Sequence, residues 1–152
     1  MSVHAIILLK EAVILMATLN DLSDAVFKKI DGEKKLSKAE MESKYSKGEK
    51  KNYKQGIYFL YDDSDNIIYV GKVGDYEKTS LRDRMVGHGS GSHKEKDKDW
   101  YDLVKEGKFH QFPSLTNKQL EQIERLMIAR LKPRYNDVSI EDDEIDEIIK
   151  NI

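Results

Sequence analysis

Apolar and polar residues alternate with a helical period near the start of the chain. The pattern predicts a helix over residues 17–30, with Asn20 or Ser23 as its cap. Farther on, Ser37 followed by Glu40 forms a capping-box pattern, which predicts a second, short helix. The first third of the chain is therefore expected to be helical.

The residues before the first predicted helix are unusually apolar. Residues 5–17 are apolar except for Lys10 and Glu11, so the run is too short and too interrupted to span a bilayer. It also lacks the basic start and the cleavage site of a signal peptide. If Met16 is the natural start, residues 1–15 are an upstream extension. Otherwise we expect an amphipathic helix that packs on the domain or on a second subunit, and no membrane association.

Two β-rich runs flank a turn-forming cluster in the middle of the chain. Residues 56–61 (GIYFLY) and 67–72 (IIYVGK) enclose Asp-Asp-Ser-Asp-Asn, which predicts a β-hairpin. We expect an even-numbered loop, such as Asp63 to Asn66, because side chains alternate between the faces of a strand. That loop would set Leu60 opposite Tyr69 and Tyr58 opposite Gly71, with both tyrosines on one face.

The remaining pattern completes a small α+β fold. We expect a helix opened by Ser80 (LRDRMVGH), a mobile loop over 87–99 and a helix over 100–106 that Gly107 ends. An edge strand containing Pro113 should follow over 109–115. The next helix should run from the Thr116/Gln119 capping box to Leu131, where Pro133 stops it, and Ser139 should cap a final acidic helix. We expect a three-stranded antiparallel sheet flanked by helices. The segments expected are a lysine-rich helical extension (1–54), a compact core (55–136) and an acidic tail (137–152).

Composition narrows the class of protein. The 152 residues are 39% apolar and 36% charged, as in a soluble globular domain. No cysteine is present, which excludes disulfides, thiol catalysis and cysteine-based zinc sites. This agrees with a reducing compartment, and we expect a cytoplasmic protein. A zinc pair of His88 and His93 is disfavoured by the same lack of cysteine.

Charge is unevenly distributed along the chain. The net charge is −2, but residues 137–152 hold seven acids against one lysine, which leaves +4 for residues 1–136. Residues 28–54 alone hold ten lysines and five acids. Such asymmetry favours a polyanionic partner, and we expect this segment to bind the charged backbone of that partner. The alternative is a solvated lysine-rich face.

Two helices carry polar residues where chemistry is plausible. Glu124 lies within the apolar stripe of its helix, where a carboxylate is costly unless it pairs with an arginine or binds a cation. Arg84 and His88 are four residues apart and share one helix face. A guanidinium can clamp a phosphate, and a histidine can move a proton. A surface pair is the alternative for the latter two.

The ordered set of motifs resembles the GIY-YIG nuclease family. Gly56-Ile57-Tyr58 is followed after ten residues by Tyr69-Val70-Gly71, with valine in place of isoleucine as the only departure. The rest follows in the family's order: Lys72, Arg84, His88, Glu124 and the closing Pro133-Arg134-Tyr135-Asn136. The resemblance covers residues 55–136.

The resemblance implies a role for each matched residue. Glu124 would be the carboxylate ligand of one Mg²⁺ or Mn²⁺ ion per site, and Arg84 would neutralise charge on the phosphate. Tyr58 would be the general base or would orient the attacking water, and Tyr69 would position water or phosphate. In support, His88 would assist the chemistry, Asn136 would brace the site, Gly71 would allow close approach, and Lys72 completes the set.

The resemblance also implies a function and partners. We expect a metal-dependent endonuclease that hydrolyses DNA phosphodiester bonds, as a restriction-type homodimer without a small-molecule cofactor. A structure-specific repair or recombination nuclease is the nearest alternative. An inactive nucleic-acid-binding module and a protein that does not bind nucleic acid are the alternatives from other classes.

Overall fold

Four antiparallel strands form the centre of the fold. The computed structural model describes residues 2–43, 55–74, 79–90 and 99–136, apart from the Leu15 side chain. In chain order the elements are α1 (Val3–Asp31), β1 (Leu36–Ser37), α2 (Lys38–Ser43), β2 (Gly56–Tyr61), β3 (Ile67–Val73), α3 (Leu81–Ser90), β4 (Glu106–Gln111) and α5 (Asn117–Leu131). The strand order is β1-β4-β2-β3, so the α+β expectation is confirmed, but the sheet has four strands and not three.

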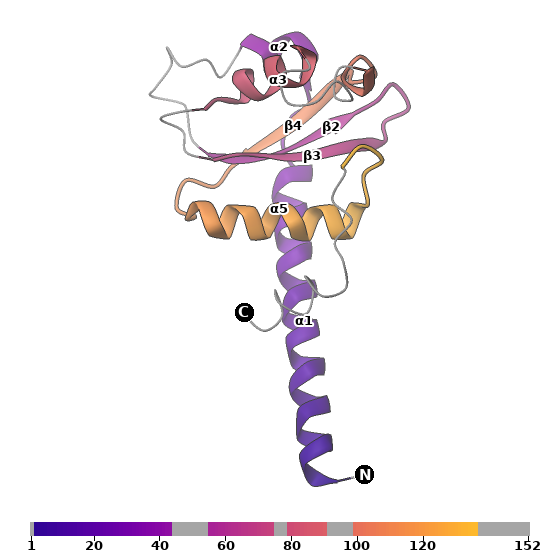
Figure 1. Cartoon of the computed structure of the whole chain (residues 1–152), viewed down its shortest axis with the longest axis vertical. Coiled ribbons are helices and arrows are strands. Elements are labelled where there is room, and N and C mark those ends of the chain that lie inside the picture. Colours follow the sequence, from indigo (N-terminus) through magenta and orange to yellow (C-terminus); the bar gives the residue numbers. More distant parts are fainter. Residues whose placement is uncertain (1, 44–54, 75–78, 91–98, 137–152) are drawn as a thin grey trace.

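Helices cover both faces of the sheet. Figure 1 shows α2 and α3 on one face, and α5 with the end of α1 on the other. Alternate residues of β2 enter two separate cores, because side chains alternate across a strand. Tyr58 and Leu60 pack on the α3 side, whereas Ile57 and Phe59 pack on the α5 side. β3 is a terminal strand of the sheet, so its edge borders both layers.

The predicted register of the hairpin is confirmed, although the loop differs. Tyr58 pairs with Gly71 and Leu60 with Tyr69. Tyr61 then pairs with Ile67, which leaves Ile68 as an extra residue in β3. Because the Asp62 N–H donates to the Asn66 carbonyl, the connection is an odd three-residue loop rather than the expected even one. It places Asp65 at φ 65°, as such loops usually require of their last residue. The bulge restores the alternation of side chains.

Most of the helix ends predicted from capping residues are confirmed. The capping box of Thr116 and Gln119 starts α5, and Lys132 ends it in the left-handed region just before Pro133. Ser37 and Glu40 exchange the two hydrogen bonds of the other capping box. The Ser80 hydroxyl accepts from the Asp83 N–H at the start of α3. Each of these short-range signals fixed a helix end, because capping depends on neighbouring residues alone.

Other expectations about secondary structure are wrong. Helical structure near Trp100 ends after Tyr101, and Gly107 lies inside β4 instead of ending a helix. Addition of a Cβ at Gly107 would bring it within 2.3 Å of the Met41 sulfur, so packing under α2 explains this glycine. The start of β4 pairs with β1, so that strand is not at the sheet edge there. Residues 87–90 belong to α3 and not to a loop. The rest of that loop and the acidic helix lie outside the described residues.

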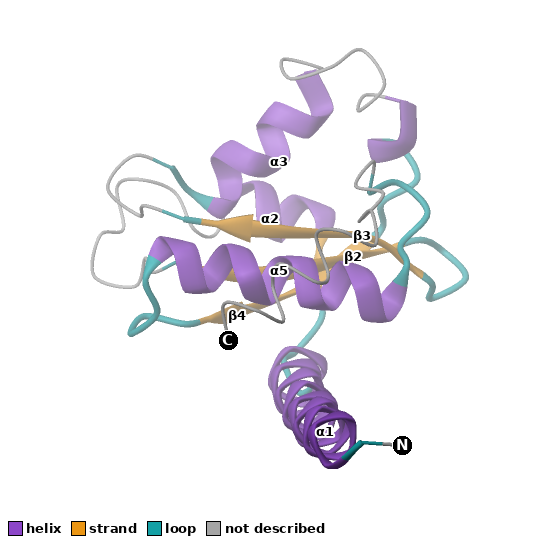
Figure 2. Ribbon diagram, turned by 60° about the horizontal axis from the view of Figure 1, so that its bottom comes forward, coloured by secondary structure: helices purple, strands orange, loops and turns teal. Residues whose placement is uncertain are grey.

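The helix α1 is longer than predicted. It starts at Val3, with Ser2 as its cap, so Asn20 and Ser23 lie inside it. Its last turns pack against the α5 side of the sheet, where Val26 and Ile30 are buried. The packed core therefore includes residues from the segment expected to be an extension. The first half of the helix projects away from the sheet (Figure 1), and Figure 2 views it nearly end on.

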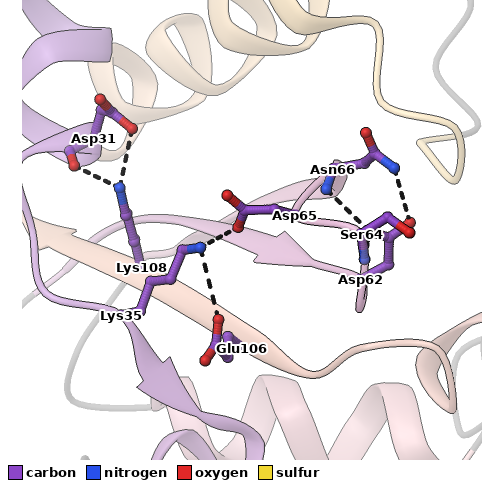
Figure 3. Close-up of polar contacts among 8 residues, drawn as sticks. All are labelled: Asp31, Lys35, Asp62, Ser64, Asp65, Asn66, Glu106 and Lys108. Atoms are coloured by element: carbon purple, nitrogen blue, oxygen red, sulfur yellow. Dashed lines mark hydrogen bonds and ion pairs between the residues drawn. The ribbon is translucent and has the colours of Figure 1, made fainter.

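A set of paired charges lies near β1, β4 and the hairpin loop. Lys35 contacts Asp65 and lies 3.7 Å from Glu106, and Lys108 lies 3.0 Å from the carboxylate of Asp31 (Figure 3). We call these five residues the paired-charge cluster. Lys108 also donates to the Asp31 carbonyl at 2.6 Å, which ties the end of α1 to the sheet. The cluster therefore joins the helix, the loop and β4.

Candidate active site

The two motif tyrosines lie side by side on the α3 face of the sheet. Their ring centroids are 6.1 Å apart, and the rings are nearly parallel. Tyr58 lies directly over Gly71, where an added Cβ would come within 2.2 Å of the tyrosine ring. The close approach expected at Gly71 is thus made by the Tyr58 side chain. The missing side chain of Gly71 sets where the phenol can lie.

The helix α3 brings its histidine onto the same tyrosine. The Tyr58 hydroxyl and His88 Nε2 are 2.9 Å apart, and both side chains are buried. The imidazole also meets the Tyr69 ring edge-on, with centroids 4.9 Å apart. With Nε2 unprotonated, the phenol donates to the imidazole. His88, four residues after Arg84, therefore lies where the helix spacing predicted, on the sheet-facing side.

Trp100 is a site residue that the sequence did not reveal as one. Its ring stacks on Tyr69 at 4.6 Å and on Tyr135 at 5.8 Å, and it lies 5.0 Å from the His88 ring. Trp100 is also buried. The contacts with Tyr69 and His88 are tertiary contacts between different elements, which no local pattern specifies.

Burial sets the protonation of Tyr58. The side chain is 1% exposed, and this desolvation raises the pKa of its hydroxyl well above 10.0. The neighbouring Tyr69 raises that pKa further, and the positive charge of Arg84 lowers it only in part. A neutral phenol is therefore the stable form in this structure. Tyr69 is only half-buried, so it is the more accessible of the two tyrosines.

Glu124 approaches from the other layer. It lies on α5, half-buried, and burial raises the pKa of its carboxyl from 4.5 to about 7. The charges of Lys72 and Arg84 act against this shift, as does a hydrogen bond from the Lys72 backbone. Glu124 in turn raises the pKa of Tyr58. The helices of both layers thus bring charge to the same edge of β3.

Neither charged helix residue is neutralised by a direct ion pair. Among the described residues, no salt bridge joins Arg84 or Glu124 to an opposite charge. The Arg84 Nε atom is buried and has no hydrogen-bond partner in the described parts of the chain. The alternative interpretation of Glu124, a buried ion pair with an arginine, is therefore not what the geometry shows. Within the described residues, the Arg84 guanidinium and the Glu124 carboxylate are therefore both available to bind a ligand.

Two further predicted residues support this edge. The Asn136 amide accepts from the Val70 N–H at 2.9 Å and donates to the Val70 carbonyl at 2.8 Å. It thus holds the strand between Tyr69 and Gly71, as a bracing residue would. Lys72 lies 3.9 Å from Glu121, the residue one turn before Glu124 on α5. Every residue of the predicted set is therefore near the edge of β3.

Two of the described lysines of residues 28–54 contact other parts of the chain, and the expected DNA contacts of this segment stay a prediction. Lys35 belongs to the paired-charge cluster. Lys38 donates to the Tyr101 carbonyl at 2.8 Å, and its ammonium lies 4.0 Å from the ring of the same residue. These two lysines hold the fold together. Residues 44–54, with half of the lysines, lie outside the described residues.

The donors at the β3 edge fit a hard cation held by one carboxylate. Glu124 is a carboxylate whose ionised form burial disfavours, and a cation beside it would restore that form. No group of three histidine, aspartate or glutamate side chains gathers within the described ranges, so a structural zinc site has no ligands there. Mg²⁺ commonly binds one or two carboxylates and keeps several waters. The donor set therefore suits Mg²⁺ or Mn²⁺.

Comparison of the chain with protein-family models and with curated proteins gives no match in either case.

Proposed function

We propose that the chain is a metal-dependent DNA endonuclease of the GIY-YIG type. One observation carries the proposal: five residues from four separate elements meet at the edge of β3. Two are tyrosines of adjacent strands, two lie on α3, and one is the carboxylate of α5. They do so in the order in which the family's motifs follow one another along the sequence.

Arg84 and Tyr69 are the residues that a phosphodiester meets first. Both are only partly buried, and the Arg84 Nε–H has no hydrogen-bond partner among the described residues. A guanidinium with free donors binds phosphate oxygens and stabilises the charge that develops on them during attack. Lys72, on β3 with Tyr69, adds a second positive charge beside that of Arg84. These groups bind and orient the substrate.

Glu124 would hold the metal ion, which supplies Lewis-acid polarisation of the phosphoryl group and stabilises the leaving oxygen. The half-buried position of Glu124 excludes part of the water that would otherwise weaken such contacts. Asn136 fixes the backbone of β3 beside the two tyrosines. One carboxylate argues for one ion per site.

The Tyr58–His88 pair acts through its shared proton. The high pKa of Tyr58 makes a free phenolate a poor description of the base. Transfer of the Tyr58 proton to His88 Nε2 would create that phenolate beside an imidazolium, so the favoured arrangement keeps the proton on the phenol, which donates it to the imidazole. Of the two roles left open for Tyr58, orientation of water through this hydrogen bond has the stronger support.

A plasmid-nicking assay tests the proposal. Purified chain should convert supercoiled DNA to open circles or linear DNA when Mg²⁺ or Mn²⁺ is added, and EDTA should stop the reaction. Undiminished cleavage in EDTA would reject the metal role. Binding without cleavage under all metal conditions would favour the inactive nucleic-acid-binding module. Sequencing of the cut ends distinguishes a restriction-type enzyme from a nuclease that recognises DNA structure.

A further inference from the structure

The first half of α1 exposes apolar side chains that the described parts of the chain do not cover. Leu9, Val13 and Met16 are 55%, 67% and 51% exposed. By length and composition α1 could cross a membrane, and its most apolar window is not buried at all. A contiguous apolar surface of this kind marks an interface in a folded protein.

One apolar stripe follows the whole helix. Its members alternate at spacings of four and three residues, which keeps them on one side of an α-helix: Ala5, Leu9, Ala12, Met16, Leu19, Ser23, Val26 and Ile30. The last three are buried against the chain's own sheet and α5. The first five continue the same surface beyond the domain. Only the second half of the stripe therefore packs against the rest of the described chain.

We propose that the first half of the stripe pairs with the same segment of a second copy in antiparallel orientation. In the pairing that centres the uncovered segment, Ala5 lies opposite Met16 of the second copy, and Leu9 lies opposite its Ala12. Each layer then sets a small side chain against a large one, which lets two helices approach closely and interdigitate. The same layers recur by two-fold symmetry, so one surface serves both copies.

The fold selects the antiparallel orientation. In a parallel pair the second helix would continue beside Ser23, Val26 and Ile30, where the chain's own domain already packs. In the antiparallel pair it ends at its own Val3, opposite Thr18, more than one turn before Ser23. The uncovered segment therefore has the length that a copy of itself needs.

The charges in the segment favour a protein partner over a lipid bilayer. Lys10 and Glu11 stand in the middle of the apolar run, at the depth where a charge is most unfavourable in a membrane. In the antiparallel pair both side chains lie on the back of the helix, in water, beside the exposed Ile7 and Ile14. His4 and Thr18 share that back surface at a spacing of seven residues from Glu11.

Multi-angle light scattering over a concentration series tests the pairing. The wild-type chain should have the mass of a dimer, and the double variant Leu9→Glu/Ala12→Glu should have the mass of a monomer. The matched control is Ile7→Glu/Ile14→Glu, which places the same charges on the back, where these residues are 48% and 67% exposed. The control should stay dimeric. Circular dichroism should show a folded core in all three proteins.

Single cysteines test the orientation, because the chain has none of its own. Under mild oxidation, a mixture of the Ala5→Cys and Met16→Cys chains should form mostly mixed disulfides, at least tenfold over either self-pair. Dominant self-pairs would show a parallel arrangement and overturn the proposal. So would a monomeric wild type at every concentration, equal loss of dimer in the control variant, or monomers that partition into phosphatidylcholine vesicles. None of these readouts depends on nuclease activity.

Discussion

The paired-charge cluster and the candidate active site differ in how they treat ionised groups. In the cluster every charge meets an opposite charge: Lys108 lies 3.0 Å from Asp31, and Lys35 contacts both Asp65 and Glu106. At the β3 edge, Arg84 lowers the pKa of Glu124, and no direct ion pair joins the two within the described residues. The first arrangement satisfies its charges inside the chain, whereas the second leaves them available.

This difference distinguishes charges that are paired within the fold from charges that are available to bind a ligand. A satisfied surface pair gains little stability and has no capacity for a ligand. A half-buried carboxylate with a raised pKa is destabilised in its ionised form, and a bound cation compensates for this cost. The same residue types therefore have opposite expected effects on mutation at the two places.

The largest effect is expected for Glu124→Gln, which should abolish cleavage and leave DNA binding largely intact. The variant should also unfold at a higher temperature at pH 8. The folded-state pKa of about 7 lies above the ordinary 4.5, so the ionised carboxylate destabilises the fold as pH rises through this range. Removal of that charge should add about 1–3 kcal/mol at pH 8 and little at pH 5.

Calorimetric melting at pH 5 and pH 8, beside a nicking assay, checks both parts of this prediction. Asp31→Asn in the paired-charge cluster is the matched control and should keep full activity with no gain in stability. If Glu124→Gln is instead less stable at pH 8, the carboxylate is a structural partner and the contrast between the two regions fails.

Arg84→Ala should lower the cleavage rate by at least about 100-fold, as when one transition-state donor is lost. Arg84→Lys should recover part of this loss, because lysine supplies a charge without the planar fork. Arg82, two residues earlier on α3, is exposed and serves as the control. Single-turnover rates on a defined duplex measure the effect. A damaging Arg82→Ala with a silent Arg84→Ala would place the wrong side of α3 at the site.

The Mg²⁺ requirement should depend on pH. Protons compete with the cation for Glu124, whose carboxyl has a pKa of about 7. The half-saturating Mg²⁺ concentration should therefore rise roughly tenfold as the pH falls from 8 to 6. Titrations of the initial rate with Mg²⁺ at each pH measure this. A constant requirement over that range would mean that the ligand is an ordinary exposed carboxylate.

The smallest effect is expected for Lys108→Met. Loss of its contacts with Asp31 should lower the free energy of unfolding by about 1 kcal/mol or less. The cleavage rate should not change, because the cluster has no part in the chemistry. Urea denaturation and the nicking assay measure the two quantities. A large loss of activity in a folded Lys108→Met chain would remove the distinction between the regions.

Much of the fold could be predicted because the signals are local. Capping residues fixed both ends of α5, and alternation of side chains fixed the pairing of Tyr58 with Gly71. The bulge at Ile68 was missed because the loop length, not the apolar pattern, creates it. The short strand β1 was missed because two residues carry no periodicity, and its pairing with β4 is a tertiary contact.

The parts of the candidate site that depend on local sequence spacing could be predicted. The spacing of Arg84 and His88 gave their shared helix face, and the position of Glu124 in an apolar stripe gave its partial burial. The protonation of Tyr58 could not be predicted, because it depends on how deeply α3 and β3 bury the phenol. The stacking of Trp100 on Tyr69 is a tertiary contact between residues distant in sequence, so no local pattern predicts it.

The stack of Trp100 on Tyr69 gives the protein its own optical reporter. Trp100 is the only tryptophan in the chain, so its fluorescence comes from one place, beside both Tyr69 and His88. A ligand that moves Tyr69 or His88 away from the indole would change that fluorescence. Intrinsic tryptophan fluorescence can therefore report on the candidate active site without an attached dye.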